Sequence, residues 1–262
     1  MTKQAVILAA GRGSRLQELG ADSPKCLLDL NGRKIIEMQI QNLFAAGVTE
    51  ICVVTGYKSS LVHAAVAKFN NVSCIENLNY ATTNSLYSLN LTREWVKGSF
   101  ICVNGDVVAH PEIFKRVAVS GGCALAFDSQ SGQDDEHMKI KRTGPRLNQI
   151  GKNLDQVHVE GENVGILQFG GQAAKTVFDA ADHLLATNGV MHWAPAVLNE
   201  LVADNFFHCV DISDLPWIEV DFPTDLFDAR TAILPAITNS LAPSFPQQLQ
   251  KSQEYIISSA AI

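Results

Sequence analysis

Hydrophobic positions in the first half of the chain alternate between short apolar runs and longer segments with helical spacing. Apolar runs typical of buried strands occupy residues 5–8, 51–54, 72–75, 100–103 and 123–127. Apolar residues at helical spacing predict helices over residues 35–46, 60–69, 84–95 and 111–119. Strands that alternate with helices indicate a mostly parallel sheet covered on both faces. The pattern therefore predicts an α/β fold, a Rossmann-like three-layer sandwich.

After residue 128 the apolar runs become shorter and more widely spaced. We expect strands at 138–141, 147–150, 165–169 and 217–221, and helices at 172–187, 194–203 and 224–232. These elements are predicted to extend the same sheet, so that residues 1–237 form a single domain. Residues of about 1–127 form the first half of this domain. Residues of about 128–221 are predicted to add further strands and helices to the same sheet, and this part is called the elaboration below. Residues 238–262 are rich in Ser, Pro and Gln and predict a loosely attached tail.

Composition narrows the classes of protein that remain. The chain has 262 residues, 47% of them hydrophobic, and a net charge of −7, which suits one large domain with a sizeable core. Lys and Arg are scattered, so we expect no nucleic-acid partner. No apolar run approaches the roughly 20 residues that cross a bilayer, and no signal-peptide pattern is visible. The six cysteines form no zinc-type pair. A cytoplasmic protein with buried, reduced cysteines is predicted.

A glycine loop follows the first predicted strand, and two common loop types do not fit it. A P-loop requires G-x-x-x-x-G-K-[ST], and Gly11 and Gly13 lack that spacing. A dinucleotide loop requires G-x-G-x-x-G and an acid at the end of the second strand. Here Leu16 replaces the third glycine, and the second strand ends in Val54-Thr-Gly56. An NAD-dependent oxidoreductase is therefore disfavoured.

A third loop type does fit. The segment Leu8-Ala-Ala-Gly-Arg-Gly-Ser-Arg-Leu16, followed by Pro24-Lys25, resembles the sugar-nucleotide-forming nucleotidyltransferase superfamily. Small residues allow close approach of backbone N–H groups to phosphates. Arg15 can bind two phosphate oxygens, and Lys25 can stabilise charge at the α-phosphate, so both are predicted as catalytic. The resemblance implies a nucleotide-diphospho-sugar transferase fold and a nucleotide bound by Leu8, Ala9, Ala10, Gly11, Gly13, Ser14, Arg15 and Lys25.

Two further segments extend the resemblance. Asn79-Tyr-Ala-Thr-Thr-Asn-Ser-Leu-Tyr-Ser-Leu89 and Trp217-Ile-Glu-Val-Asp221 look like the phosphocholine and 2-aminoethylphosphonate cytidylyltransferase branch. In that branch the asparagine-serine segment lies near the base and phosphates, which implies the same role for Asn84 and Ser85. The alternative for Asn84 is an N-cap at the start of the following helix.

Two aspartates are candidates for a metal site. Asp106 follows the predicted strand at 100–103, and Asp221 ends the one at 217–221, so both could lie at the carboxyl edge of the sheet. Mg²⁺ prefers one or two carboxylates together with phosphate oxygens and water. By resemblance these aspartates are the family's Mg²⁺ ligands, and Asp106 also belongs to the nucleotide site. The alternatives are a turn residue for Asp106 and a helix cap for Asp221.

The implied reaction transfers CMP from CTP to a small phosphorylated or phosphonate acceptor and releases pyrophosphate. The acceptor is already anionic near neutral pH, because the second pKa of a phosphate monoester is about 6. No general base is then required. The elaboration over 128–221 is expected to bind the acceptor, and its candidate residues are Lys139, Lys152, Glu162, His192, Trp193 and Glu219.

Two alternative functions remain open. The first is a sugar-1-phosphate nucleotidyltransferase, although the chain has Thr82-Thr-Asn-Ser85 where those enzymes have a glycine-rich segment. The second is a non-catalytic nucleotide-binding regulatory protein on the same fold. Retention of both loop cations and both aspartates favours an enzyme. Association into homodimers and the identity of the acceptor also stay open.

Overall fold

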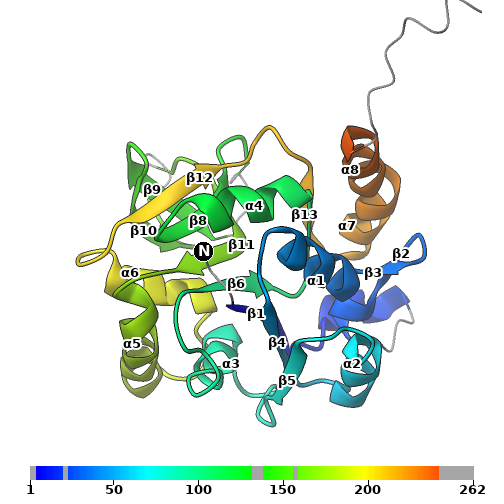
Figure 1. Cartoon of the computed structure of the whole chain (residues 1–262), viewed down its shortest axis with the longest axis horizontal. Coiled ribbons are helices and arrows are strands. Elements are labelled where there is room, and N and C mark those ends of the chain that lie inside the picture. Colours follow the sequence, from blue (N-terminus) through cyan, green and yellow to red (C-terminus); the bar gives the residue numbers. More distant parts are fainter. Residues whose placement is uncertain (1–3, 20–22, 132–137, 156–158, 242–262) are drawn as a thin grey trace, which may run out of the picture.

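The computed structural model describes residues 4–19, 23–131, 138–155 and 159–241, and a nine-stranded sheet lies at its centre (Figure 1). The strands are β1 (Gln4–Ala9), β4 (Glu50–Thr55), β5 (Val72–Glu76), β6 (Phe100–Asn104), β8 (Cys123–Asp128), β9 (Lys139–Thr143), β10 (Arg146–Gly151), β11 (Glu162–Phe169) and β12 (Phe207–Asp211). Their order across the sheet is β5-β4-β1-β6-β11-β8-β12-β10-β9.

The sheet is mostly parallel, as the sequence predicts. Strands β5, β4, β1 and β6 pair in parallel, and so do β8 and β12. Strand β11 runs antiparallel to β6, β8 and β9, and β10 runs antiparallel to β9 and β12. Only β10 and β11 among the nine described strands of this sheet are therefore reversed. Elements from both halves of the chain share one sheet.

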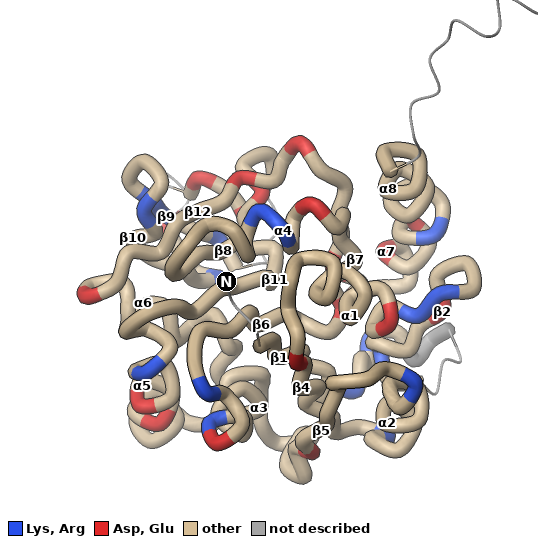
Figure 2. The backbone as a smooth tube through the Cα atoms, viewed as in Figure 1, with Lys and Arg blue, Asp and Glu red and all other residues tan. Residues whose placement is uncertain are grey.

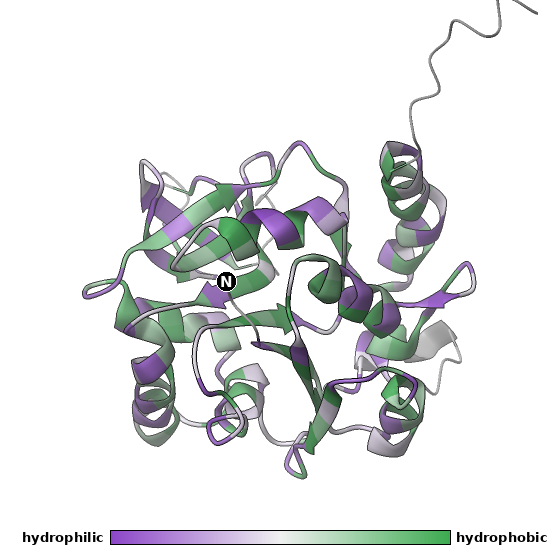
Figure 3. Cartoon of the chain, in the orientation of Figure 1, coloured by the Kyte–Doolittle hydropathy of each residue, from purple (hydrophilic) through white to green (hydrophobic). Residues whose placement is uncertain are grey.

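Helices cover both faces of the sheet. Helices α1 (Ile35–Ala45), α2 (Ser59–Val66) and α4 (Pro111–Val119) contribute to the hydrophobic core on one face. Helices α3 (Ser85–Asn90), α5 (Ala173–Asn188) and α6 (Leu198–Leu201) contribute to the core on the other. Successive side chains of β1 point to opposite faces of the sheet. Ile7 packs in the core beneath α1, α2 and α4, and Leu8 packs in the core beneath α3, α5 and α6. The three-layer arrangement is confirmed, and Figure 3 shows the hydrophobic strands between the helices.

Several elements differ from the sequence-based expectation. The helix expected at 84–95 is α3, which ends at Asn90, and the short strand β7 (Val107–Ala109) was not predicted. The helix expected at 194–203 is a 3₁₀ turn (Ala194–Val197) followed by the short α6, which ends at Leu201. The strand expected at 217–221 is β13 (Trp217–Glu219), which pairs with β7 (Val107–Ala109) and not with the central sheet. Strand β12 was not predicted, although its burial alternates with period two: Phe207 and Cys209 are buried and His208 is exposed.

The C-terminal part of the described chain is helical. Helix α7 (Pro223–Asp228) continues through a π-helical turn (Ala229–Ile233) into α8 (Leu234–Leu241). A third hydrophobic cluster joins this segment to the short strand β7 and to α1, through residues that include Leu226, Val108 and Met38. The tail expected at 238–262 therefore begins inside α8, and residues 242–262 lie outside the described part.

The described surface carries both signs of charge. Figure 2 shows Lys and Arg dispersed among Asp and Glu over several elements. Within the described residues, no helix combines the length and apolar character that crossing a membrane requires.

Candidate active site

The carboxyl ends of β1 and β6 lie side by side and carry two of the predicted motifs. These strands pair in parallel from Gln4 to Leu8, so the loop after Ala9 and the turn after Asn104 emerge at the same edge. Gly105 permits this close approach, since a Cβ at that position would lie 2.7 Å from the carbonyl oxygen of Leu8. Asp106 is thereby placed directly beside the glycine loop.

Asp221 reaches the same edge through the short β7–β13 ribbon. Glu219 pairs with Val107 in this antiparallel ribbon, and the N–H of Val220 donates to the carbonyl oxygen of Asp106 at 3.1 Å. Two residues that are 115 positions apart in sequence are thus brought together by main-chain pairing.

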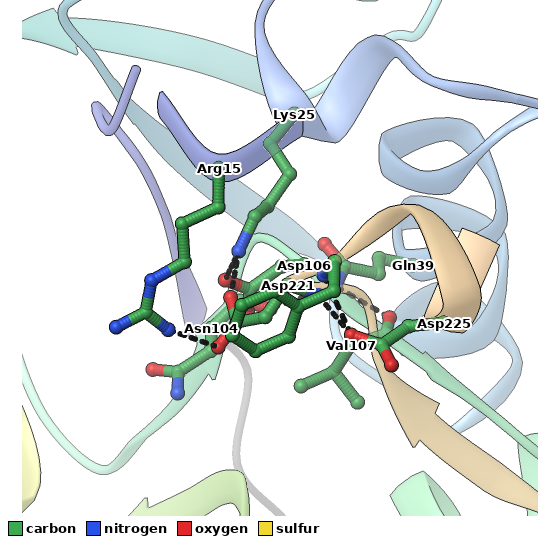
Figure 4. A network of polar contacts seen from close by, with 9 residues as sticks. Arg15, Lys25, Gln39, Asn104, Asp106, Val107, Asp221 and Asp225 are labelled. Carbon is green, nitrogen blue, oxygen red and sulfur yellow. Dashed lines mark hydrogen bonds and ion pairs between the residues drawn. The ribbon is translucent and has the colours of Figure 1, made fainter. Parts of the chain in front are cut away.

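The ammonium group of Lys25 lies between the two aspartates. Its Nζ is 2.9 Å from Oδ2 of Asp106 and also contacts Oδ1 of Asp221, as Figure 4 shows. Burial lowers the pKa of Lys25, but the charges of Asp106 and Asp221 and their hydrogen bonds raise it by more, so the net pKa lies above its ordinary value. Arg15 approaches Asp221 from the loop side, with an N–O distance of 3.8 Å. The two predicted catalytic cations therefore converge on the predicted metal ligands.

Two polar side chains, the buried Gln39 and the half-buried Asp225, hold the aspartates in place. The side-chain amide of Gln39 donates to the carbonyl oxygens of Asn104 and Val107, each at 2.8 Å, and so fixes the turn that carries Asp106. The carboxylate of Asp225 accepts from the backbone N–H groups of Asp221 and Phe222 at 2.8 and 2.7 Å. Figure 4 shows both supports.

Negative charge is concentrated at this point. Burial, together with the charges of Asp106 and Asp221, raises the pKa of Glu219 well above its ordinary value. Oδ1 of Asp106 is buried and has no hydrogen-bond donor among the described residues. This atom and the adjacent carboxylates suit a hard cation. No group of three or more His, Cys, Asp or Glu in the described residues forms a metal cage by itself. The donor set thus fits Mg²⁺ that takes its remaining ligands from substrate and water.

A cavity of about 230 Å³ opens over the glycine loop and Asp106. The predicted nucleotide-site residues that line it are Leu8, Ala9, Ala10, Gly11, Gly13, Lys25, Asn84, Ser85 and Asp106. Ser14 and Arg15 line a second, adjoining cavity of about 350 Å³. Gly13 adopts a left-handed backbone, with φ of +63°, where the loop turns over the side chain of Lys25.

One wall of the first cavity was not predicted from the sequence. Asn77, which is 1% exposed, donates from its side-chain amide to the hydroxyls of Thr83 and Ser88, both at 3.0 Å. Its own Oδ1 accepts from the N–H of Asn79 at 2.9 Å. Asn77, Thr83 and Ser88 all line the cavity, as does Tyr80. Asn77 directly follows β5, at the carboxyl edge of the sheet. This position in the sequence is the only signal that could have pointed to a role for Asn77 in the site.

The segment at 190–194 is tied to the start of α3. The N–H groups of Asn84 and Leu86 donate to the carbonyl oxygens of Val190 and His192 at 2.9 and 3.0 Å. Ser85 completes the link by accepting from the N–H of Ala194 at 2.7 Å. Asn84 also caps α3, since its Oδ1 accepts from the N–H of Ser85. Both proposed roles of Asn84, capping and cavity lining, are compatible.

The predicted acceptor residues are distributed over different places. Trp193 lines the first and second cavities, and Lys152 lines the second. Glu162 lines a third cavity of about 280 Å³, together with Asp128, Trp217, Phe222 and Asp225, and Glu219 lines both the first and the third cavity. Asp221 is the only residue of the described chain that lines both the second and the third cavity.

Two predicted acceptor residues line none of these three cavities. Lys139 is fully buried, because it pairs across the sheet with Glu162 in the β9–β11 register. Any effect of Lys139 on an acceptor in these cavities must therefore act through a neighbouring residue. His192 is not among the residues that line the three cavities, and its buried Nε2 has no hydrogen-bond partner among the described residues.

Fold and site together define a protein of the nucleotidyltransferase class, with a glycine loop and two aspartates at one edge of a three-layer α/β sheet. The sequence of residues 5–203 matches the MobA-like NTP transferase domain family, and the chain belongs to that family.

Similar proteins include several cytidylyltransferases. The chain is 26% identical over 246 residues to the CTP:phosphoglutamine cytidylyltransferase of Campylobacter jejuni, covering 85% of this chain and 97% of that protein. It is 26% identical over 247 residues to the bifunctional IPC transferase and DIPP synthase of Aquifex aeolicus, covering 94% of this chain but only 55% of that longer protein. The solved structure of CTP:phosphocholine cytidylyltransferase from Streptococcus pneumoniae has a TM-score of 0.74 at 19% identity and covers 88% of this chain and 98% of its own. This likeness confirms the nucleotide-diphospho-sugar transferase fold.

Proposed function

We propose that this protein transfers CMP from CTP to a small phosphorylated or phosphonate head group and releases pyrophosphate. The observation that carries the proposal is the contact of Lys25 with both Asp106 and Asp221 beneath the glycine loop. That arrangement joins a phosphate-binding loop, a buried cation and a pair of carboxylates at one point. A protein that only senses nucleotides has no need to retain all three.

The nucleotide is proposed to lie in the first cavity. Its α-phosphate faces Lys25, where the ammonium stabilises charge that develops at that phosphate. Arg15 and the N–H groups of the loop hold the remaining phosphates. The cytosine edge faces the hydroxyls of Thr83 and Ser88, whose orientation is set by Asn77. A hydroxyl can donate or accept, so this wall can satisfy both the carbonyl and the amino group of cytosine.

Asp106 and Asp221 are proposed to hold Mg²⁺. The ion would polarise the phosphate oxygens and neutralise charge on the departing pyrophosphate. In the structure the ammonium of Lys25 already bridges these carboxylates. When nucleotide binds, Lys25 has an alternative anionic partner in the α-phosphate, which frees carboxylate oxygens for the metal.

The acceptor's phosphoryl oxygen is the proposed nucleophile. It is anionic near neutral pH, so the residues of the site only need to position it. The third cavity adjoins Asp221 and is lined by the acidic side chains of Asp128, Glu162 and Asp225. These carboxylates complement an ammonium group, as in 2-aminoethylphosphonate or phosphocholine, better than a neutral sugar. The face of Trp193 is not an open aromatic cage, because the ammonium of Lys152 lies 4.3 Å from its ring centroid.

Pyrophosphate release tests the proposal. Each of CTP, UTP, ATP and GTP is incubated with phosphocholine, 2-aminoethylphosphonate, phosphoglutamine, inositol-1-phosphate and glucose-1-phosphate, with and without Mg²⁺. We expect Mg²⁺-dependent release with CTP and with an acceptor that carries an ammonium group. Release only with a sugar-1-phosphate would replace this function by that of a sugar-nucleotide synthase. Tight nucleotide binding without turnover of any pair would favour the regulatory alternative.

A further inference from the structure

A short hairpin follows Lys25 in the chain and lies beside the C-terminal helical segment (Figure 1). It consists of β2 (Asp29–Leu30) and β3 (Arg33–Lys34), which pair antiparallel. Asn31 and Gly32 connect the two strands with φ angles of 55° and 88°. Positive values at both positions are the reason why Asn-Gly is preferred in two-residue hairpin turns. The sequence therefore encodes a tight turn close to the proposed catalytic lysine.

Arg230, in the π-helical turn after α7, is bonded to this hairpin at two points. Its Nε and Nη2 both donate to the carbonyl oxygen of Asp29, at 2.9 and 2.7 Å. Its own carbonyl oxygen accepts from the side-chain amide of Asn31 at 3.1 Å. The planar guanidinium is preorganised for paired donation, so little entropy is lost for each bond that it forms. Side chain and backbone of one residue thus hold the hairpin together.

The π-helical turn makes the carbonyl group of Arg230 available to Asn31. In such a turn an N–H donates to the residue five positions earlier, and the N–H of Leu234 donates to Ala229. In a regular α-helix the same N–H would donate to Arg230. The next residue, Pro235, has no N–H to donate. The irregular turn therefore leaves this carbonyl for a contact outside the helix.

The contact reaches Lys25 through the main chain and through packing. The N–H of Leu28 donates to the carbonyl oxygen of Lys25 at 3.1 Å, and the carbonyl oxygen of Leu28 accepts from Ile35 at 3.4 Å. Leu28 is buried in the third hydrophobic cluster, which also contains Ala229, the neighbour of Arg230. The backbone at Lys25 is thus anchored to the C-terminal segment on both sides of Asp29.

We propose that Arg230 is a positioning residue for the nucleotidyl transfer: through the β2–β3 hairpin it holds Lys25 between Asp106 and Asp221. This inference rests on the proposed function for the role of Lys25. Arg230 lines none of the three cavities, so it acts through its neighbours. The ammonium of Lys25 contacts both carboxylates from the end of a flexible stem, so a shift of its main chain would misplace it. Misplacement of a catalytic group by about 1 Å can lower a rate about 10²-fold.

Amine labelling and turnover of the full chain test this role in the wild type, Arg230→Gln and Arg230→Lys. In the wild type Lys25 should react slowly with acetic anhydride at about pH 8, because its contacts with two aspartates keep the ammonium protonated. In Arg230→Gln its labelling should become severalfold faster relative to that of Lys97, an exposed lysine in the same sample. The kcat for pyrophosphate release should fall about tenfold, with little change in KM for the nucleotide. Arg230→Lys retains one donor and should recover part of both properties.

Three further variants separate positioning from a general loosening of the hairpin. Arg33→Gln removes the same charge from the hairpin itself, but the guanidinium of Arg33 donates to Gln41 of α1, so labelling and kcat should stay unchanged. Asn31→Gly keeps a residue that favours positive φ and removes only the amide donor, so it should reproduce part of the Arg230→Gln effect. Added to Lys25→Gln, Arg230→Gln should lower the residual kcat no further, because both substitutions act on one group.

Several outcomes would overturn the assignment. Unchanged labelling of Lys25 in Arg230→Gln contradicts it, and so do equal effects of Arg230→Gln and Arg33→Gln. A further loss of kcat on the Lys25→Gln background would mean that Arg230 acts through another group. If Arg230→Gln does not fold, labelling of Asn31→Gly decides. Labelling needs no substrate, so absence of turnover with every nucleotide and acceptor would contradict the proposed function, whereas faster labelling would still support the positioning of Lys25.

Discussion

The carboxylate of Asp225 accepts a hydrogen bond of 2.8 Å from the backbone N–H of Asp221. The same carboxylate accepts from the next N–H, that of Phe222, and so closes the first turn of α7. One of the proposed metal ligands is therefore positioned by the residue that caps the adjacent helix. A substitution of Asp225 should therefore affect both the stability of α7 and the position of Asp221.

Asp225→Ala should lower both stability and turnover. Loss of an N-terminal capping carboxylate costs about 1 kcal/mol, which for a chain of this size corresponds to roughly 2–4 °C in Tm. The fall in kcat should correspond to more than this roughly 1 kcal/mol, because Asp221 also loses the hydrogen bond that positions its backbone. Thermal denaturation and pyrophosphate release measure the two effects. Asp228→Ala, at the exposed end of the same helix, should change neither, and an equal effect of both substitutions would contradict the anchoring role.

Gln39→Leu tests the support of Asp106 from the opposite side. Gln39 is 1% exposed and donates to two carbonyl oxygens of the β6–β7 turn. Leucine has a similar volume but no donor, and carbonyl groups that lose a buried donor cost about 1–3 kcal/mol. We expect a lower Tm and a lower kcat, with little change in KM for the nucleotide. Gln41→Ala, on the exposed face of α1, provides the comparison.

Lys25→Gln should lower kcat strongly while the protein still folds. Removal of one preorganised group that stabilises transition-state charge typically costs about 10²–10³ in kcat. Asp106→Asn should have a similar effect on kcat through the proposed metal. Circular dichroism and Tm verify folding in both variants. Normal Mg²⁺-dependent turnover in both would falsify the proposed mechanism.

The same lysine substitution predicts a change in metal response. In the wild type the ammonium of Lys25 offsets the charges of Asp106 and Asp221. Without it, these carboxylates and Glu219 repel one another, and a divalent cation can take the place of the ammonium. Millimolar Mg²⁺ should therefore raise the Tm of Lys25→Gln by more than it raises that of the wild type. An equal shift in both would mean that the ion binds elsewhere.

Cysteine reactivity should be slow and should rise with pH. Burial raises the pKa of four thiols to about 12, those of Cys26, Cys52, Cys102 and Cys209. Burial raises the pKa of Cys74 as well, but this residue is only half-buried. A thiol reagent near pH 8 should therefore modify Cys74 first, at a rate that increases about tenfold per pH unit below its pKa. Cys74→Ser should remove the fast phase; if it persists, another thiol is the accessible one.

The alternation of strands and helices could be predicted from the sequence, because parallel strands that are buried on both faces appear as continuous apolar runs, as in Ile51-Cys-Val-Val54. The proximity of Asp106 to the glycine loop followed from the rule that parallel strands end at one edge. Strand β12 was missed because only Phe207 and Cys209 face the core, and five residues give a weak period of two.

The contacts of the acceptor half could not be derived in the same way. Lys139 lies in a polar, strand-like segment that looks exposed, and its burial depends on where β11 pairs with β9. The approach of Lys152 to Trp193 joins two segments 41 residues apart, and no local pattern encodes it. The role of Asn77 was likewise hidden, since a single amide after a strand has many possible partners. Local patterns predict elements, whereas long-range register determines these contacts.

The three hydrogen bonds between residues 84–86 and 190–194 have a consequence for how such a protein can diversify. The segment 190–194, whose Trp193 lines the first and second cavities, is bonded through its backbone to the segment 84–86, which is proposed to contact the nucleotide. A loop graft at 190–194 from a relative with another acceptor would therefore also shift Asn84 and Ser85. Exchange of both segments as one unit should preserve nucleotide use, whereas exchange of either alone should impair it. Evolution of a new substrate preference is thus expected to change the segments 84–86 and 190–194 together, although they are far apart in the sequence.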